Sequence, residues 1–322
     1  MSAPTLDKAD RPADDGDVPG GTPAPPPTTP PAPRPAPAAA PRRPRAPAPA
    51  GRGRNALVRT ATATTLLGFL LVGFVFYLLA LSGLQEGHFQ SSAYRTFQNQ
   101  LAEAVAPTGT APDGAPVAVI EIPAIGLRQT VVVDGTTGRD LMRGPGHRRD
   151  TALPGQTGVS VVYARRNSFG APFADLARLR VGDKIYATTG QGRSVYTVNV
   201  YGSSAHPAVD PSPDRLVLVT ADSDWITTGT ISVSARLDGT AMANPGGRPG
   251  TVPTDQALAS DTAGLPALQL WALALLAAVT LLVLRGRQWW PKGAAYLVFT
   301  PVLGLLLWSV YESAAALLPN LY

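Results

Sequence analysis

Cysteine is absent from the 322 residues, and only 15 % of them are charged. Without a thiol the chain cannot form a structural disulfide, a thiolate zinc site, an iron–sulfur cluster or a cysteine nucleophile. A charged fraction this far below the roughly 25 % of an average soluble domain indicates that part of the chain avoids water. We therefore expect a membrane protein, and any chemistry it performs must use groups other than thiols.

Three apolar runs carry no charged residue. They are Thr60–Gln85, Thr262–Leu284 and Gly293–Tyr311. A helix that rises about 1.5 Å per residue crosses the ~30 Å hydrocarbon core of a bilayer in ~20 residues. The sequence therefore predicts three transmembrane helices, at residues 60–85, 265–284 and 293–318.

The basic residues flank these runs. Residues 1–59 hold nine Lys and Arg against five Asp, and the loop at residues 285–292 holds three basic residues, whereas residues 86–261 hold fifteen basic and sixteen acidic ones. Lys and Arg near helix ends favour the cytoplasmic side. We expect a multi-pass cell-membrane protein with a cytoplasmic N-terminus, extracellular residues 86–261 and an extracellular C-terminus. The net positive charge thus comes from the segments that flank the apolar runs, and no nucleic-acid motif is present.

The first 59 residues are rich in Pro, Ala and Arg, and 16 of the 33 prolines lie in residues 1–50. Such a composition cannot build a core, so a disordered cytoplasmic tail is expected. After the first apolar run, residues 86–116 predict an amphipathic stalk helix and a linker. The apolar side chains of the stalk recur at helical spacing, at Phe89, Tyr94, Phe97 and Leu101, and Pro107 stops the helix.

Between residues 117 and 240 the hydrophobic period shortens to two, which is typical of strands. Seven short segments show it: Val117–Ile122, Gln129–Val133, Gly158–Tyr163, Lys184–Thr189, Arg193–Tyr201, Arg215–Ala221 and Thr230–Leu237. Phe173–Leu179 is the one evident helical turn. The expected class is mainly β, a sandwich or barrel of seven to eight strands outside the membrane. Residues 241–264, rich in Gly, Pro and Thr, are expected to be an extended, mobile linker.

Six strings in this region follow one another in a characteristic order. They are Ile120–Thr137, Asp140–His147, Thr151–Gly158, Phe169–Ile185, Leu216–Ser223 and Ile231–Leu237. In this order they resemble the sortases, the cysteine transpeptidases of Gram-positive cell surfaces, and within them the class E and F sortases of actinobacteria. The resemblance implies a β-barrel of seven to eight strands and no cofactor.

The reaction of that family needs a cysteine, a histidine and an arginine, and the resemblance places none of them here. Ala221 stands at the cysteine position, Arg165 at the histidine position and Thr230 at the arginine position. An alanine methyl cannot attack a carbonyl. The sequence therefore predicts a catalytically degenerate sortase domain, whose former groove includes Arg165, Arg166, Ala221, Asp222 and Ser223.

Other polar residues in this region suggest alternative roles. Ser223 with His206 could support an acyl-transferring or hydrolytic enzyme, although spacing alone does not pair them. His147 is expected to be a hydrogen-bonded turn residue. Asp222 and Asp224 supply too few ligands for a metal ion, so no metal site is predicted. We expect instead that Arg165 forms an ion pair with Asp222 and closes the former groove.

Three functions stay open on the sequence alone. The first is an inactive sortase-like protein with a binding or scaffolding role at the Gram-positive cell envelope. The second is an enzyme with a non-cysteine nucleophile such as Ser223, and the third is a structural subunit of a membrane complex. The corresponding partners are a secreted or surface protein with a sorting signal, or another integral membrane protein.

Overall fold

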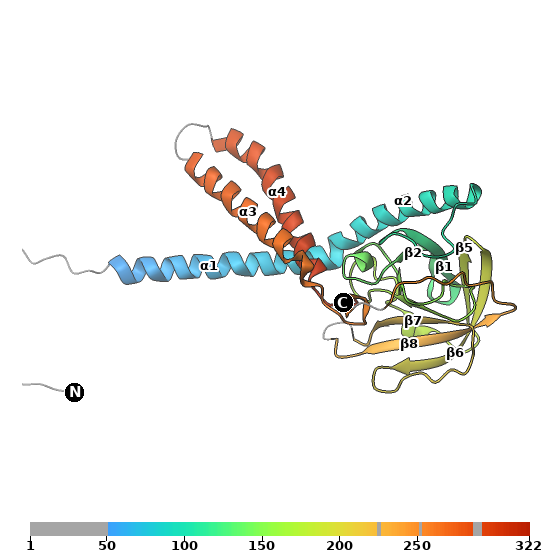
Figure 1. Ribbon diagram of the computed structural model, residues 1–322. Coiled ribbons are helices and arrows are strands. Elements are labelled where there is room, and N and C mark those ends of the chain that lie inside the picture. Colours follow the sequence, from blue (N-terminus) through green and yellow to red (C-terminus); the bar gives the residue numbers. More distant parts are fainter. Residues whose placement is uncertain (1–50, 224–226, 251–252, 286–291) are drawn as a thin grey trace, which may run out of the picture. The chain divides into compact units, whose positions relative to one another are not determined.

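The computed structural model describes residues 51–223, 227–250, 253–285 and 292–322. Most of the predicted tail, residues 1–59, and of the basic loop, residues 285–292, lies outside the described residues. Eight strands are found in the described part (Figure 1). They are β1 (Pro116–Ile122), β2 (Leu127–Asp134), β3 (Gly146–His147), β4 (Val159–Tyr163), β5 (Lys184–Thr189), β6 (Gly192–Ser203), β7 (Arg215–Ala221) and β8 (Thr230–Asp238).

The strands close into one barrel, in the order β1-β2-β3-β4-β7-β8-β6-β5. The pairs β2–β3 and β4–β7 are parallel, and the other neighbours are antiparallel. Closure satisfies the hydrogen bonds of every strand edge, so short strands suffice. The predicted β-barrel is confirmed, and all seven predicted strands are present.

The barrel interior is filled by alternate side chains of the strands, such as Ile120, Ile185 and Leu218, each fully buried. The connection from β4 to β5 adds Phe173 and Leu176 to the same core. There the predicted helical turn is a 3-10 turn at Leu176–Arg178. This core fixes the ends of β4, β7 and β8, where the candidate site lies.

The first helical region runs without interruption from α1 (Gly51–Phe76) through a π-helical turn (Tyr77–Leu81) into α2 (Ser82–Ala102). The predicted stalk is thus a continuation of the first long apolar helix. It packs on the barrel, because Phe97 is buried in a cluster with residues of β1 and β2. The Gln90 side chain adds two hydrogen bonds with the Val131 main chain, of 2.8 and 3.0 Å.

Two further helices, α3 (Leu265–Arg285) and α4 (Lys292–Ala316), lie side by side (Figure 1). Among the described residues, three helical segments are long and apolar enough to cross a membrane, namely Ala56–Ala102, Thr262–Leu284 and Leu297–Ala316. The α4 helix contacts the first helix through aromatic rings: Trp308 lies 5.1 Å from Tyr77, centroid to centroid. The Gln85 amide also donates to the Glu312 carboxylate at 3.1 Å.

The segment between the barrel and α3 differs from the extended tether that its composition predicts. The Met242 amide donates to the Gly155 carbonyl at 2.8 Å, and the Met242 carbonyl accepts from the Thr157 amide at 2.9 Å. Further along, Asp255 is 2 % exposed. These contacts hold the linker against the barrel. The composition of the linker does not predict them, because its main-chain groups bond to loops elsewhere in the chain.

Candidate functional site

The ends of β4, β7 and β8 meet at one end of the barrel. The parallel β4–β7 pair matches Tyr163 with Val219, and the antiparallel β7–β8 pair matches Ala221 with Thr230. Beyond Tyr163, the Ala164 carbonyl accepts a 2.8 Å hydrogen bond from the Thr220 hydroxyl. The barrel therefore gathers Ala221 and Thr230, with the residues that follow β4, into one place.

Ala221 and Thr230 offer little chemistry there. Ala221 is fully buried in an apolar cluster with Val161, Tyr163 and Val219. Thr230 is half-buried, and its amide donates to the Ser204 hydroxyl at 3.2 Å. The first side chain is a methyl group, and the second is a neutral hydroxyl.

Arg165 is completely buried and bonds mainly to main-chain oxygens. Its guanidinium donates to the Tyr322 main-chain oxygen at 2.8 Å and to the Gly138 carbonyl at 2.9 Å, with a longer bond of 3.3 Å to the Ser168 hydroxyl. It also lies 4.9 Å from the centroid of the Phe169 ring. Burial lowers the pKa of Arg165 to about 9, because a desolvated cation is disfavoured.

The predicted ion pair between Arg165 and Asp222 is wrong. Among the described residues Arg165 forms no ion pair with Asp222, whose carboxylate accepts instead from the amide and the hydroxyl of Thr228, each at 3.2 Å. Slight burial raises the pKa of Asp222, but bonds from Gly229 and Thr228 outweigh it and leave the pKa below its ordinary value. The turn between β7 and β8 satisfies Asp222 locally, and residues far along the chain satisfy Arg165.

The other candidate residues lie around this point. Arg166 donates from Nη1 to the Ala221 carbonyl at 3.3 Å. Ser223 is half-buried and directly precedes residues 224–226, so Asp224 lies outside the described residues. His206 is exposed in the connection from β6 to β7, where its amide donates to the Ser203 hydroxyl at 3.0 Å.

Sequence reasoning missed the segment that covers these residues. Leu321 is completely buried and shares the apolar cluster of Ala221. Asn320 is also completely buried, and its side-chain amide donates to the Thr136 carbonyl at 2.7 Å and the Gln256 carbonyl at 2.9 Å. The signal in the sequence is Pro319, which is unfavourable within a helix and is followed, after Asn320, by Leu321 and Tyr322.

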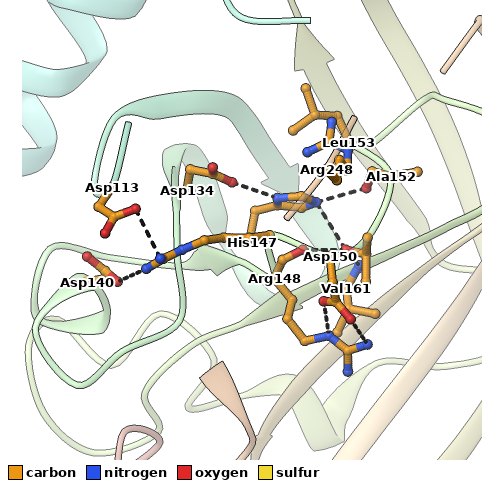
Figure 2. A network of polar contacts seen from close by, with 12 residues as sticks. Asp113, Asp134, Asp140, His147, Arg148, Asp150, Ala152, Leu153, Val161 and Arg248 are labelled. Atoms are coloured by element: carbon orange, nitrogen blue, oxygen red, sulfur yellow. Dashed lines mark hydrogen bonds and ion pairs between the residues drawn. The ribbon is translucent and has the colours of Figure 1, made fainter. Parts of the chain in front are cut away.

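His147 is hydrogen-bonded, as predicted, but it lies in the strand β3 and not in a turn. Its ring is completely buried, with Nδ1 at 3.0 Å from an Asp134 carboxylate oxygen and Nε2 at 2.9 Å from the Ala152 carbonyl oxygen. Figure 2 shows these two partners on opposite sides of the ring. The contacts tie β2 and β3 to the turn before β4.

A second polar cluster lies next to it (Figure 2). Arg149 forms ion pairs with Asp113 at 3.1 Å and with Asp140 at 3.3 Å. Burial raises the pKa of Asp140, although hydrogen bonds from Thr137 and the charge of Arg149 act against it. In the described part of the chain, no group of three His, Asp or Glu side chains is arranged to hold a metal ion. Arg149 is the cation that these acids share.

Comparison with protein families found one matching model. The sequence model of the Sortase domain matches residues 120–237. Sortase E from Streptomyces avermitilis is 29 % identical, covering 40 % of this chain and 91 % of that one, with a TM-score of 0.34. The Sortase D5 transpeptidase of Clostridium perfringens is 23 % identical, covering 47 % of this chain and 99 % of that one, with a TM-score of 0.41.

The SrtF sortase from Corynebacterium diphtheriae is 25 % identical and covers 43 % of this chain and 92 % of its own, with a TM-score of 0.37. A search of curated proteins returned no match. The family match runs from within β1 into β8, and these strands form the closed barrel described above. Residues 120–237 are therefore a sortase-family domain.

Proposed function

We propose that this chain is a catalytically inactive sortase-fold membrane protein, with a binding or scaffolding role at the Gram-positive cell envelope. One observation carries the proposal: β7 ends at the buried Ala221, directly opposite Thr230 at the start of β8. These are the positions at which the resemblance places the nucleophile and the oxyanion-stabilising arginine of sortases.

Cysteine transpeptidation needs a thiolate that attacks a carbonyl, an acid that protonates the leaving amine and a cation near the developing oxyanion. Ala221 has no nucleophilic atom. Arg165 cannot act as a histidine-like acid and base, because its guanidinium is buried and bonded to main-chain carbonyls. Thr230 carries no charge. The three roles are therefore unfilled at the three positions.

The membrane helices support a role at the envelope. The charge distribution favours a cytoplasmic tail, and three crossings then place the C-terminal side of α4 and the barrel outside. The contacts agree with this arrangement, since Leu321, beyond α4, is buried in a cluster with barrel residues. Both parts must lie on the same side of the bilayer to make that contact.

The first test is an assay for transpeptidation. The full chain, purified in detergent, is incubated with sorting-signal peptides and an amine acceptor, next to a functional sortase as the positive control. We expect no product above the blank without protein. Product that disappears on Ser223→Ala would replace the proposal with a hydroxyl-dependent enzyme, and product that survives that change would also contradict it.

The second test concerns the partner. Crosslinking in native membranes, followed by purification of the chain, should recover a secreted or surface protein with a sorting signal if the barrel binds such proteins. Recovery of an integral membrane protein alone would instead indicate a structural subunit of a membrane complex.

A further inference from the structure

We propose that residues 318–322 are an intramolecular ligand of the groove at the ends of β4 and β7. This segment, called here the C-terminal plug, is Leu318-Pro319-Asn320-Leu321-Tyr322. It follows α4, so the groove of the barrel is occupied by an extension of a membrane helix. The inference holds whether or not the chain has an activity, because it concerns only what fills the groove.

The apolar part of the contact is made by Leu321. This side chain is completely buried and shares a cluster with Leu141, Val161, Val219 and Ala221. The cluster draws on β4 and β7, the two strands whose parallel pairing forms the floor of the site. Leu321 therefore fills the space next to the position where a sortase would carry its nucleophile.

The polar part of the contact satisfies the main chain of the plug. The Arg166 amide donates to the Leu321 carbonyl at 3.4 Å, and the Asn320 amide donates to the Ala259 carbonyl at 2.9 Å. The Tyr322 main-chain oxygen accepts from both the Ser168 hydroxyl, at 2.7 Å, and Arg165. The plug itself is a turn, in which the Tyr322 amide donates to the Pro319 carbonyl at 3.0 Å, and the outer main-chain groups of this turn are bonded to the barrel domain and the linker.

Asn320 provides the specific contact. Both donors of its side-chain amide are used, one by Thr136 in the barrel and one by Gln256 in the linker. The linker thus forms a second wall of the groove, and the plug lies between it and the barrel. Exchange of Asn320 for an apolar residue would leave the Thr136 and Gln256 carbonyls without this donor.

The hydrogen bonds of Arg165 depend on whether the plug occupies the groove. The buried charge of Arg165 is stabilised in part by the Tyr322 main-chain oxygen, so departure of the plug removes an acceptor from a desolvated cation. Water or another peptide carbonyl must then take its place. The empty groove is therefore expected to bind a peptide that presents a buried apolar side chain and a main-chain carbonyl to Arg165.

The proposal is tested by returning the plug as a separate molecule. A chain that ends at Leu317 and the full chain are each titrated, in detergent, with a fluorescent peptide of the sequence of residues 316–322. We expect the shortened chain to bind at least tenfold more tightly than the full chain, whose groove is already filled. The same peptide with Leu321→Asp should not bind the shortened chain. Equal binding by both chains, or none by a folded shortened chain, would overturn the proposal.

A second measurement keeps the test decisive if the shortened chain does not fold. The absence of cysteine allows a pair to be introduced in the full chain, Ala221→Cys with Leu321→Cys, and treated in membranes with a mild oxidant, because two side chains of one buried cluster can form a disulfide without access for a bulky reagent. We expect efficient intramolecular crosslinking. The matched control pairs Leu321→Cys with Arg215→Cys, at the other end of β7 and about 20 Å further along the strand. Crosslinking no better than in this control would refute the occupied groove.

Discussion

The burial of Arg165 makes a quantitative prediction about stability. In Arg165→Ala, the main-chain oxygens of Gly138 and Tyr322 lose a charged donor, and a hydrogen bond to a charged group contributes ~1.5–3 kcal/mol. The lost contact with the Phe169 ring and the cavity left by the side chain lower the stability further. The variant no longer buries a cation, which opposes these losses. We therefore expect the free energy of unfolding to fall by about 2–4 kcal/mol.

The matched variant is Asp222→Ala. Its carboxylate is bonded within its own turn and largely exposed, so a loss below about 1 kcal/mol is expected. Chemical unfolding of the purified full chain, followed by circular dichroism, gives both values and that of the double variant. The two losses should add within ~0.5 kcal/mol, because the residues share no contact. A coupling of about 1 kcal/mol or more between them would show that the ion pair exists and would refute this reasoning.

Three further predictions follow from other sites. A cysteine introduced at Ser91 should react with a membrane-impermeant thiol reagent on intact cells and one at Gly286 should not; the reverse pattern would refute the topology. His147→Phe should lower the unfolding free energy by about 2–4 kcal/mol, because Asp134 is left buried without its partner, and a loss below 0.5 kcal/mol would contradict this account. Burial raises the pKa of Asp210, but hydrogen bonds, chiefly from Ser234, outweigh this effect and lower the pKa to about 2. The ionised Asp210 therefore stabilises the fold fully above the ordinary carboxyl pKa, and this stabilisation is lost as the pH falls towards 2. Thermal unfolding between pH 5 and about 2 should therefore show a smaller pH dependence in Asp210→Asn, and an unchanged dependence would contradict the assignment.

The strands of the barrel were predictable because their pattern is local. Lys184–Thr189 alternates between buried and more exposed positions, Arg215–Ala221 is a short run rich in Leu and Val, and both end next to turn-forming residues; the structure gives these two strands with the predicted bounds. The strand Gly146–His147 was not predicted, since two residues carry no period. What the periodicity of a segment can show is thus limited by its length.

The partner of Arg165 could not be read from the sequence for a different reason. The parallel pairing of β4 and β7 correctly indicates that the residues after these strands lie near each other. It does not indicate which acceptors a long side chain will reach. Arg165 bonds to Tyr322, 157 positions away, and no pattern of charge or hydropathy connects these two residues. The same holds for the linker contacts of Asn320.

The residues that the resemblance places at the catalytic positions of sortases fit the proposed plug. A thiolate at position 221 would be a charge buried against Leu321, and desolvating an unpaired anion is costly, whereas the methyl group of Ala221 packs in the apolar cluster. A histidine at position 165 has two ring nitrogens, and Arg165 uses donors on both terminal nitrogens to bond Tyr322, Gly138 and Ser168. The groups that a transpeptidase needs and the groups that hold the plug therefore compete for the same positions, and this chain carries those that suit the plug.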